Sequence, residues 1–268
     1  MLFRSGPRLL VTVDNGIASV DGVDRANQLG LEVIVTDHHL PGKTLPNAAA
    51  IVNPNQRGCL FPGKSTAGVG VAFYLLSATR SLLRSRGWFE TRAEPNLAEW
   101  LDLVALGTIA DVVPLDRNNR RLVTEGIRRI RAGRSRPGLY ALLEVAGLDR
   151  QFITTRDLAF SVAPRLNAAG RLQDMSVGIE CLLADEQRAA ELAMNLDQLN
   201  TERKEIEAGM RDEALAHLSN LSLDAEQAAG LCFYQKDWHQ GIVGILAARV
   251  KERSHRPAID FAYRKRAS

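Results

Sequence analysis

Residues 31–39, Leu31-Glu32-Val33-Ile34-Val35-Thr36-Asp37-His38-His39, join a short apolar run to an acid and two adjacent imidazoles. The run is typical of a buried strand in a parallel sheet that is covered on both faces. Ligand sites in such sheets gather at the carboxyl ends of the strands. The stretch therefore predicts an α/β fold with chemistry at Asp37, His38 and His39.

The same layout occurs once earlier in the chain. Residues 9–13 are apolar and lead into Asp14, and residues 19–30 between the two runs have helical spacing at Val20, Val23, Ala26 and Leu29. This order is a βαβ unit, whose two strands are parallel neighbours. We expect Asp14 to lie beside the Asp37-His38-His39 cluster.

A third apolar stretch, residues 101–110, ends in Asp111, and we interpret it as a further strand of the same kind. Carboxylates mixed with imidazole suit Mn²⁺, Mg²⁺ or Zn²⁺, and the lack of cysteine favours the harder ions of phosphate chemistry. Each residue alone has a structural alternative, such as a helix cap for Asp14 or Asp111 and a polar niche for the histidines. The coincidence of three such ends favours a metal site.

Composition agrees with a nucleic-acid enzyme. The net charge of the 268 residues is only +3, but six of the 34 basic residues are lysines and the rest are arginines, which bind phosphate in bidentate fashion. The three cysteines are isolated, which supports neither a disulfide framework nor a zinc ribbon. The sequence contains neither a long continuous apolar run nor a signal-peptide core, so we expect a cytoplasmic protein without a membrane segment.

The densest charge lies between residues 117 and 136. It consists of Arg117, Arg120, Arg121, Arg128, Arg129, Arg131, Arg134 and Arg136. A basic face of this kind is either a solvated helix surface or a surface for the nucleic-acid backbone. Arg120, Arg121 and Arg128 are the candidates for a DNA surface.

The C-terminal third has a different pattern. Residues 185–217 have the spacing of one long helix, with apolar positions at Leu192, Leu196, Leu199, Ile206, Met210 and Ala214. Such a helix is longer than one small domain needs internally, and a coiled-coil dimer helix is one structural interpretation of it. A strand at 229–234 and a helix at 241–253 then begin a second domain, in which Trp238 is either a core residue or a stacking residue.

Three motifs resemble those of a known family. Val11-Thr12-Val13-Asp14-Asn15-Gly16, Val35-Thr36-Asp37-His38-His39 and residues 107–115 are similar to the second, third and fourth motifs of the DHH phosphoesterases. Residues 53–73, 163–172 and 238–249 resemble, in order, the single-strand-specific DNA exonucleases of that family. The resemblance extends over nearly the whole chain.

The resemblance implies a fold and an activity. It implies a DHH domain at 1–184, with a parallel sheet and flanking helices, a connecting helix at 185–220 and the start of a smaller α/β domain at 221–268. The activity would be metal-dependent 5′-to-3′ hydrolysis of single-stranded DNA in repair and recombination. Mn²⁺ or Mg²⁺ would occupy a two-metal site.

The resemblance also implies residue roles. Asp14, His38 and Asp111 would bind one ion, Asp37 would support them and His39 would contact the scissile phosphate. Substrate phosphates would be held by Arg165, Asn167, Arg171 and His239, with a structural loop as the alternative for 163–172. A single-strand-binding protein and a helicase are the expected protein partners.

Two departures qualify this picture. The family has an Asp-x-Asp motif on a strand before Asp14 and a Gly-Gly-His motif beyond the last residues here, and the sequence contains neither. We therefore interpret the chain as an internal fragment whose own activity is impaired. The alternatives are a phosphodiesterase for oligoribonucleotides or cyclic dinucleotides, and a non-catalytic relative that binds single strands.

Overall fold

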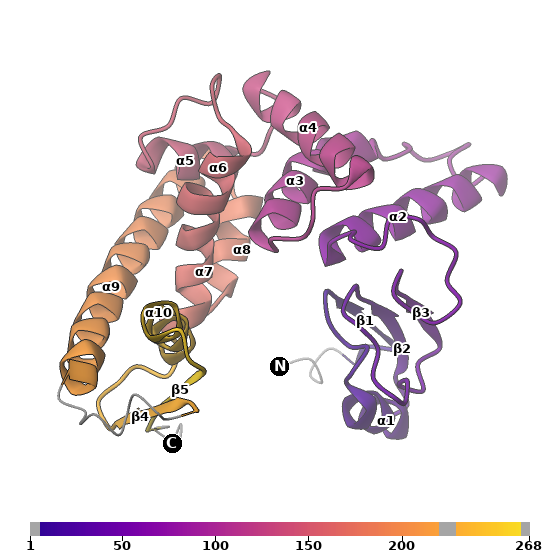
Figure 1. Ribbon diagram of the computed structural model, residues 1–268. Coiled ribbons are helices and arrows are strands. Elements are labelled where there is room, and N and C mark those ends of the chain that lie inside the picture. The colour runs from indigo at the N-terminus through magenta and orange to yellow at the C-terminus, as the bar shows by residue number, and fades with distance from the viewer. Residues whose placement is uncertain (1–5, 220–228, 264–268) are drawn as a thin grey trace. The chain divides into compact units, whose positions relative to one another are not determined.

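The computed structural model describes residues 6–219 and 229–263, which form two compact units (Figure 1). The first unit comprises Met1–Ser135 and Asp149–Ala159, and the second comprises Arg136–Leu148 and Phe160–Ser268. These units do not follow the domain boundaries implied by the resemblance, because two separate segments form each unit. The boundary expected at residues 220 and 221 lies outside the described residues, and the sequence domains stay a prediction.

The first unit contains a parallel sheet of three strands in the order β1-β2-β3. The elements are β1 (Leu9–Val13), α1 (Val20–Gln28), β2 (Glu32–Thr36) and β3 (Ala50–Val52). Val13 pairs with Thr36 across the first two strands, so the residues that follow them, Asp14 and Asp37, emerge side by side. The predicted βαβ unit is confirmed. The strand β3 was not predicted, because three residues are too few to show a period.

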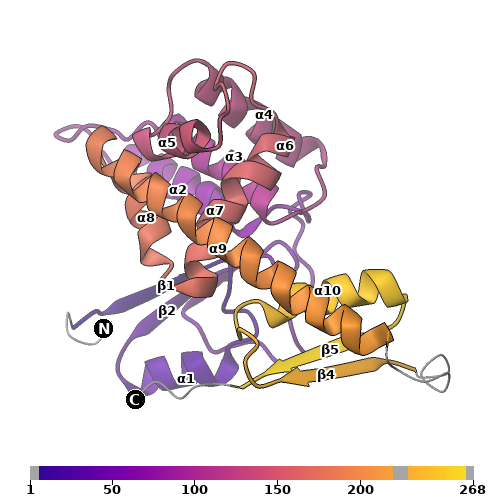
Figure 2. The same cartoon turned by 90° about the vertical axis from the view of Figure 1, so that its left-hand side faces the viewer.

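The helix α1 covers one face of this sheet. Val33 and Val35 of β2 are fully buried and pack with Val23 and Ala26 of α1. Leu9, Val11 and Val13 on the other face of β1 are about half exposed, so the cover expected on both faces is not seen among the described residues. The helix α2 (Gly68–Ser85) contacts β1 and β2 and begins beside the end of β1 (Figures 1 and 2). The first residue of α2 therefore lies close to the strand ends.

The strand predicted at residues 101–110 is wrong. These residues form the α-helix α3 (Leu101–Ala110), and Asp111 is its C-cap. The helix packs between α2 and α4 (Arg117–Arg131), and seven of its ten residues are buried. A helix that is apolar all round has no 3.6-residue period and cannot be told from a buried strand by pattern. Its length of ten residues was the usable signal.

Three short helical elements also lie between β3 and the long helix described below. They are η2 (Leu97–Trp100), α6 (Thr155–Asp157) and the π-helix η3 (Leu158–Val162). The π-helix runs directly into α7 (Ala163–Leu172) at the point where the chain passes from the first unit into the second.

The second unit is built on α9 (Glu186–Ser219), a helix of 34 residues that matches the predicted long helix. It packs against α5 (Pro137–Val145), α7, α8 (Ser176–Leu183) and α10 (Val243–Ser254). The predicted face is buried, with Leu196 and Ala214 fully inaccessible. Other helices of the same unit thus cover the face that a coiled-coil dimer would use.

A small parallel sheet of β4 (Leu231–Gln235) and β5 (Ala258–Ala262) closes this unit. Trp238 is buried in its core, and its indole N–H donates to Glu213 at 2.8 Å. The tryptophan is therefore a core residue. In the part of the chain that the structure describes, no helix is both long and apolar enough to span a membrane.

Candidate metal centre

Asp14 occupies a strained position at the end of β1. Its φ of +66° lies in the left-handed region, which residues other than glycine rarely adopt, and its N–H donates to the carbonyl of Thr36 at 3.0 Å. The carboxylate lies against Gly68, the first residue of α2. A Cβ built on Gly68 would fall 2.2 Å from Oδ1 of Asp14. The amino end of a helix favours a nearby negative charge, so α2 both makes room for this carboxylate and stabilises it.

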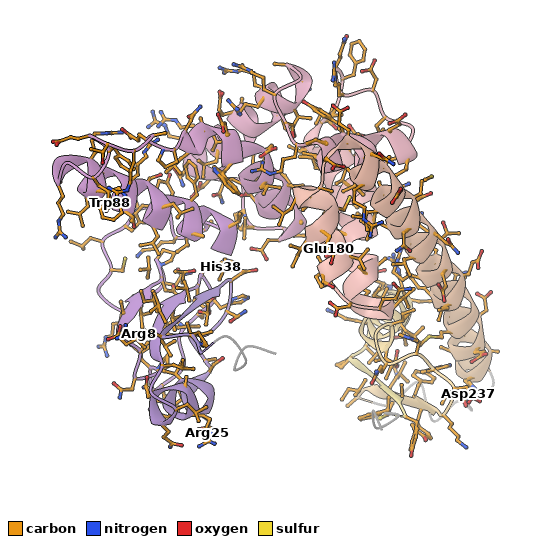
Figure 3. All side chains as sticks on the ribbon, turned by 180° about the vertical axis from the view of Figure 1, so that it is seen from behind. Arg8, Arg25, His38, Trp88, Glu180 and Asp237 are labelled. Carbon is orange, nitrogen blue, oxygen red and sulfur yellow. The ribbon has the colours of Figure 1, made fainter. Side chains whose placement is uncertain are left out.

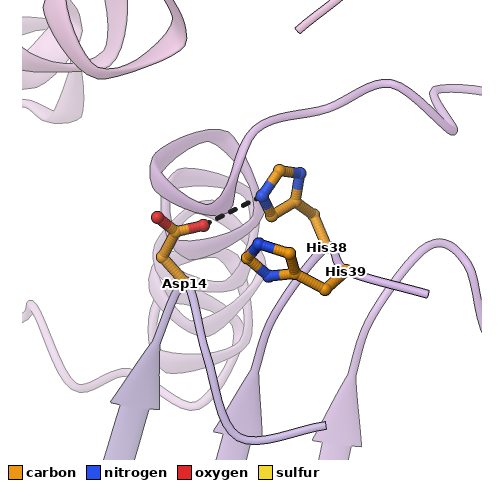
Figure 4. Close-up of side chains that lie close together, drawn as sticks. All are labelled: Asp14, His38 and His39. Carbon is orange, nitrogen blue, oxygen red and sulfur yellow. Dashed lines mark ion pairs between the residues drawn. The ribbon is translucent and has the colours of Figure 1, made fainter. Parts of the chain in front are cut away.

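His38 lies between two carboxylates. Its Nε2 is 3.0 Å from Oδ1 of Asp14, an ion pair drawn in Figure 4, and 3.2 Å from Oδ2 of Asp111. Nε2 of His38 and Oδ2 of Asp111 are both buried, and neither forms a hydrogen bond. Buried polar atoms are nearly always hydrogen-bonded, so atoms that converge without bonding fit a shared cation. The convergence expected of Asp14, His38 and Asp111 is confirmed.

Asp111 reaches this point from the end of α3. The next residue, Val112, has a φ of +57° and is largely exposed. A β-branched residue in the left-handed region is strained, and the chain accepts this strain directly beside a candidate ligand. Burial raises the pKa of the Asp111 carboxyl, and the charge of Asp14 raises it further. Both effects disfavour a second anion here unless a positive charge is present.

The Asp37 carboxylate accepts hydrogen bonds from several backbone N–H groups near the ends of β1 and β2. Its Oδ2 accepts the N–H of Ile17 at 2.9 Å, and its Oδ1 accepts the N–H groups of His38 at 2.7 Å and His39 at 3.1 Å. Burial alone would raise the pKa of Asp37, but these hydrogen bonds and the His39 imidazole hold it below the ordinary value. Asp37 is therefore an ionised support that fixes both histidines.

His39 differs from His38 in its exposure. Its Nδ1 lies 2.7 Å from Oδ1 of Asp37, while more than half of the side chain, 58%, is exposed. The hydrogen bond to Asp37 raises the pKa of His39 above the usual value, although burial opposes it. One ligand atom each from His39, His38 and Asp14 lies within 4.8 Å of the others. Nδ1 of His39 already forms a hydrogen bond with Asp37, whereas Oδ2 of Asp111 has no hydrogen-bond partner among the described residues. Asp14, His38 and Asp111 are therefore the better set for a cation.

Three supporting residues were not predicted. Nδ2 of Asn55 donates to the carbonyl of His38 at 2.5 Å, and Nδ2 of Asn53 donates to that of His39 at 3.0 Å. Gly68 is the third. The Asn53-Pro54-Asn55 and Gly68-Val69-Gly70 segments belonged to the resemblance, but only the structure gives them a task. Figure 3 shows His38 at the end of the sheet, near the start of α2, and Trp88 just beyond the opposite end of α2.

The substrate-binding candidates of the second unit are held by the protein itself. Arg165 pairs with Asp197 at 2.8 Å and donates to the carbonyl of Ser161 at 2.6 Å. Arg171 donates to the carbonyl of Gly241 at 3.0 Å, and Nδ1 of His239 accepts the N–H of the same residue. Asn167 is exposed on α7, which is a helix and not a loop.

The arginines of α4 divide into two groups. Arg131 donates twice to the carbonyl of Ile153, and Arg128 pairs with Glu125 at 3.1 Å, so both are engaged. Arg120 and Arg121 are exposed, and neither guanidinium group has a hydrogen bond or ion pair within the described part of the chain. The predicted DNA surface therefore has two uncommitted guanidinium groups.

Comparison with known proteins shows what the chain resembles. Residues 4–108 match the model of the DHH family, N-terminal domain. The matched stretch includes the strand ends that carry Asp14, Asp37, His38 and His39. Over 95% or more of its length, the chain is similar to one branch of that family, the RecJ exonucleases.

Two relatives show the extent of this similarity. The chain is 61% identical to the single-stranded-DNA-specific exonuclease RecJ of Escherichia coli and 60% identical to that of Salmonella typhimurium, over 96% of the chain and 45% of each relative. It thus spans less than half the length of these proteins.

Solved structures agree with the sequence comparison. A crystal structure of exonuclease RecJ bound to manganese matches with a TM-score of 0.80 and 36% identity, over 95% of this chain and 61% of that one. The RecJ of Thermus thermophilus in complex with Mn²⁺ matches with a TM-score of 0.78 and 37% identity, over 95% of this chain and 36% of that one.

Proposed function

We propose that this chain forms part of a RecJ-type exonuclease that hydrolyses single-stranded DNA from the 5′ end and releases mononucleotides. The observation that carries the proposal is the convergence of Asp14, His38 and Asp111 on atoms that are buried without hydrogen bonds. The names of the similar proteins favour DNA over the alternatives of oligoribonucleotides, cyclic dinucleotides or binding without catalysis.

The three residues would hold Mn²⁺ or Mg²⁺, the ions named for the similar crystal structures. Such an ion, when bound, polarises a phosphoryl oxygen and lowers the pKa of its water. A two-metal site stays a proposal, because the second ion would need the Asp-x-Asp motif that this sequence lacks.

Asp37 and His39 have the remaining roles: Asp37 would orient His39, and His39 would donate a hydrogen bond to the substrate. Asp37 fixes Nδ1 of His39, so Nε2 is the ring nitrogen that is free to face substrate. The raised pKa keeps the imidazole protonated at higher pH than an ordinary histidine, which suits donation to a non-bridging phosphate oxygen. Without Asp37, the His39 ring would lose the hydrogen bond that orients it and that raises its pKa.

The site of action and the partners belong to the same proposal. Arg120 and Arg121 would contact the strand backbone, with Arg165, Asn167, Arg171 and His239 as further substrate contacts. Arg165 is the weakest candidate of these, because Asp197 already pairs with it. We place the protein in the cytoplasm, in DNA repair and recombination, with a single-strand-binding protein and a helicase as partners.

Metal binding is the first test. Mn²⁺ titration of the chain, followed by the loss of the free-ion electron paramagnetic resonance signal, should give one site. Asp14→Asn or His38→Ala should weaken it by about 10- to 100-fold. Asp24→Asn removes an exposed carboxylate of α1 and is the matched control, which should bind as the parent does. Equal affinity in Asp14→Asn and Asp24→Asn would refute the centre.

Nuclease activity is the second test. Mononucleotide release from a 5′-labelled single strand with Mn²⁺ should be weak in this chain and should rise when an upstream strand with Asp-x-Asp is added. Asp14→Ala should abolish the gain. Efficient cleavage of dinucleotides with poor cleavage of long strands would instead support the phosphodiesterase alternative. Binding of single strands should weaken steeply with salt, because phosphate contacts release counterions.

A further inference from the structure

Two adjoining hollows lie between the loop after β3, α2 and the start of α4, and they share the rings of Phe61 and Tyr74. The first, which we call the apolar part, has a volume of about 280 Å³ and is lined also by Ile51, Val71 and Asn53, the residue that donates to the carbonyl of His39. The second, which we call the basic part, has a volume of about 400 Å³ and is lined also by Arg117 and Arg121. Volumes of this order accept small ligands.

The rings and the guanidinium groups are arranged for two different parts of one ligand. Phe61 and Tyr74 meet edge to face, with centroids 5.4 Å apart, so ring surface remains for a planar group to pack against. The hydroxyl of Tyr74 donates to Asn118 at 2.5 Å, which fixes that ring. Arg117 and Arg121 are exposed and have no ion-pair partner within the described residues.

The remaining polar groups in the walls are mostly committed. Oδ1 of Asp116 accepts the N–H of Asn119 at 2.8 Å as the cap of α4, and the carboxylate forms no ion pair with either arginine within the described residues. Nε2 of Gln56, a residue that lines the apolar part, donates to the carbonyls of Ile51 and Asn53. Its amide oxygen would be the acceptor for the exocyclic amine of a planar heterocycle.

We propose that these two hollows together, which we term the aromatic pocket, bind a nucleotide unit. The base would lie in the apolar part against Phe61 and Tyr74, and the phosphate would lie in the basic part beside Arg117 and Arg121. The inference goes beyond the proposed hydrolysis, because none of the candidate metal ligands lines the pocket. The nucleotide is either a free mononucleotide or one residue of a bound strand.

The test uses the metal-free chain in EDTA, so that the metal centre cannot contribute. Deoxyadenosine monophosphate is the probe, and its affinity is measured by calorimetry. Deoxyadenosine and phenyl phosphate, which each carry one half of the recognised chemistry, should bind about tenfold more weakly or worse. Phenyl phosphate that binds as tightly as the nucleotide would overturn base recognition.

Matched double variants assign the pocket. Arg117→Ala with Arg121→Ala should weaken the probe by about tenfold or more, because both phosphate partners are lost. Arg8→Ala with Arg25→Ala removes the same charge from exposed positions labelled in Figure 3 and should leave affinity unchanged. Equal losses in the two double variants, or none in the first, would overturn the proposal.

Two further arms complete the experiment. Phe61→Leu keeps the pocket apolar but removes stacking, so it should weaken the nucleotide and leave phenyl phosphate less affected; equal effects on both ligands would contradict a base-stacking role. A short single strand titrated against Phe61→Leu, which leaves the arginines of the proposed DNA surface intact, identifies the source. A parallel loss assigns the pocket to a residue of the strand, and an unchanged strand affinity assigns it to the free mononucleotide.

Discussion

The strand ends of the first unit and the start of α7 in the second unit were both expected to do chemistry, but they use their polar groups in opposite ways. At the strand ends, Nε2 of His38 and Oδ2 of Asp111 converge with no hydrogen bond. At the start of α7, Arg165 already donates to Asp197 and to the carbonyl of Ser161.

This difference separates a ligand site from a structural interaction. A buried polar atom that is left without a partner costs free energy, so its persistence indicates a missing partner from outside the chain. An arginine that already has a carboxylate and a carbonyl as partners within the chain needs none. The test of a candidate site is therefore what its atoms leave unsatisfied, and four substitutions can break or sharpen this contrast.

The largest effect is expected from Gly68→Ala. Its Cβ would overlap both the carboxylate and the Cβ of Asp14, so the end of β1 must shift and the carboxylate moves away from His38. Mn²⁺ affinity should fall by about 100-fold. Gly244→Ala is the control, since a Cβ there meets nothing within 4 Å. Unchanged Mn²⁺ affinity in Gly68→Ala would show that the position of Asp14 is not decisive.

Arg165→Ala should have the reverse profile. Asp197 would lose its partner in a half-buried setting, so the free energy of unfolding should fall by about 2 kcal/mol in chemical denaturation. Mn²⁺ affinity should not change. Arg188→Ala removes an exposed pair with Glu191 and should cost about 0.5 kcal/mol or less. A loss of DNA affinity at full stability would instead make Arg165 a substrate contact.

The sequence was sufficient to predict a helix or strand where its hydrophobic pattern is local. The two runs that frame α1 and the spacing of α9 predicted those elements, since each period extends over enough residues to be distinctive. It failed at α3, because burial on every side removes the period, and at β3, which is too short to have one. The convergence of Asp14, His38 and Asp111 was predicted correctly although the element that carries Asp111 was not.

Other features depend on contacts between distant residues. The clearance that Gly68 gives to Asp14, and the hydrogen bonds from Asn53 and Asn55 to the histidine carbonyls, join positions well separated in the chain. The division into two units also has no local signal, because α5 and α7 pack on α9 from separate segments. No composition shift marks these boundaries.

Asp260 differs from both sites. Among the described residues, neither of its carboxylate oxygens has a hydrogen-bond partner, and Asp260 belongs to no cluster that could hold a metal ion. Burial raises the pKa of Asp260 to about 6. A raised carboxyl pKa means that the folded state holds the proton more tightly. Stability should therefore fall as the pH rises from about 4 through about 6.

Thermal unfolding at about pH 5 and about pH 8 measures this effect. Asp260→Asn keeps the shape without the charge, so the melting temperature should lose most of its dependence on pH across that range. A melting curve of the parent that is flat across the same range would show that solvent reaches the carboxylate. Mn²⁺ affinity should be the same in both proteins.

The smallest effect is expected from Gly209→Ala in α9. Nothing lies within 4 Å of a Cβ at that position, so alanine should raise the free energy of unfolding by about 0.5 to 1 kcal/mol through helix propensity alone. The measurement is a denaturant titration, and neither Mn²⁺ nor DNA affinity should change. A destabilised variant would indicate that α9 needs flexibility at its middle.

The position of Asp111 on a helix has a mechanical consequence. Asp14 and His38 lie at the ends of sheet strands, whereas Asp111 ends α3. An ion bound by all three would therefore link the helix to the end of the sheet. Occupancy would then slow the opening of α3, because local unfolding would have to release the ion as well. Amide hydrogen exchange along Leu101–Ala110 should therefore follow the metal concentration.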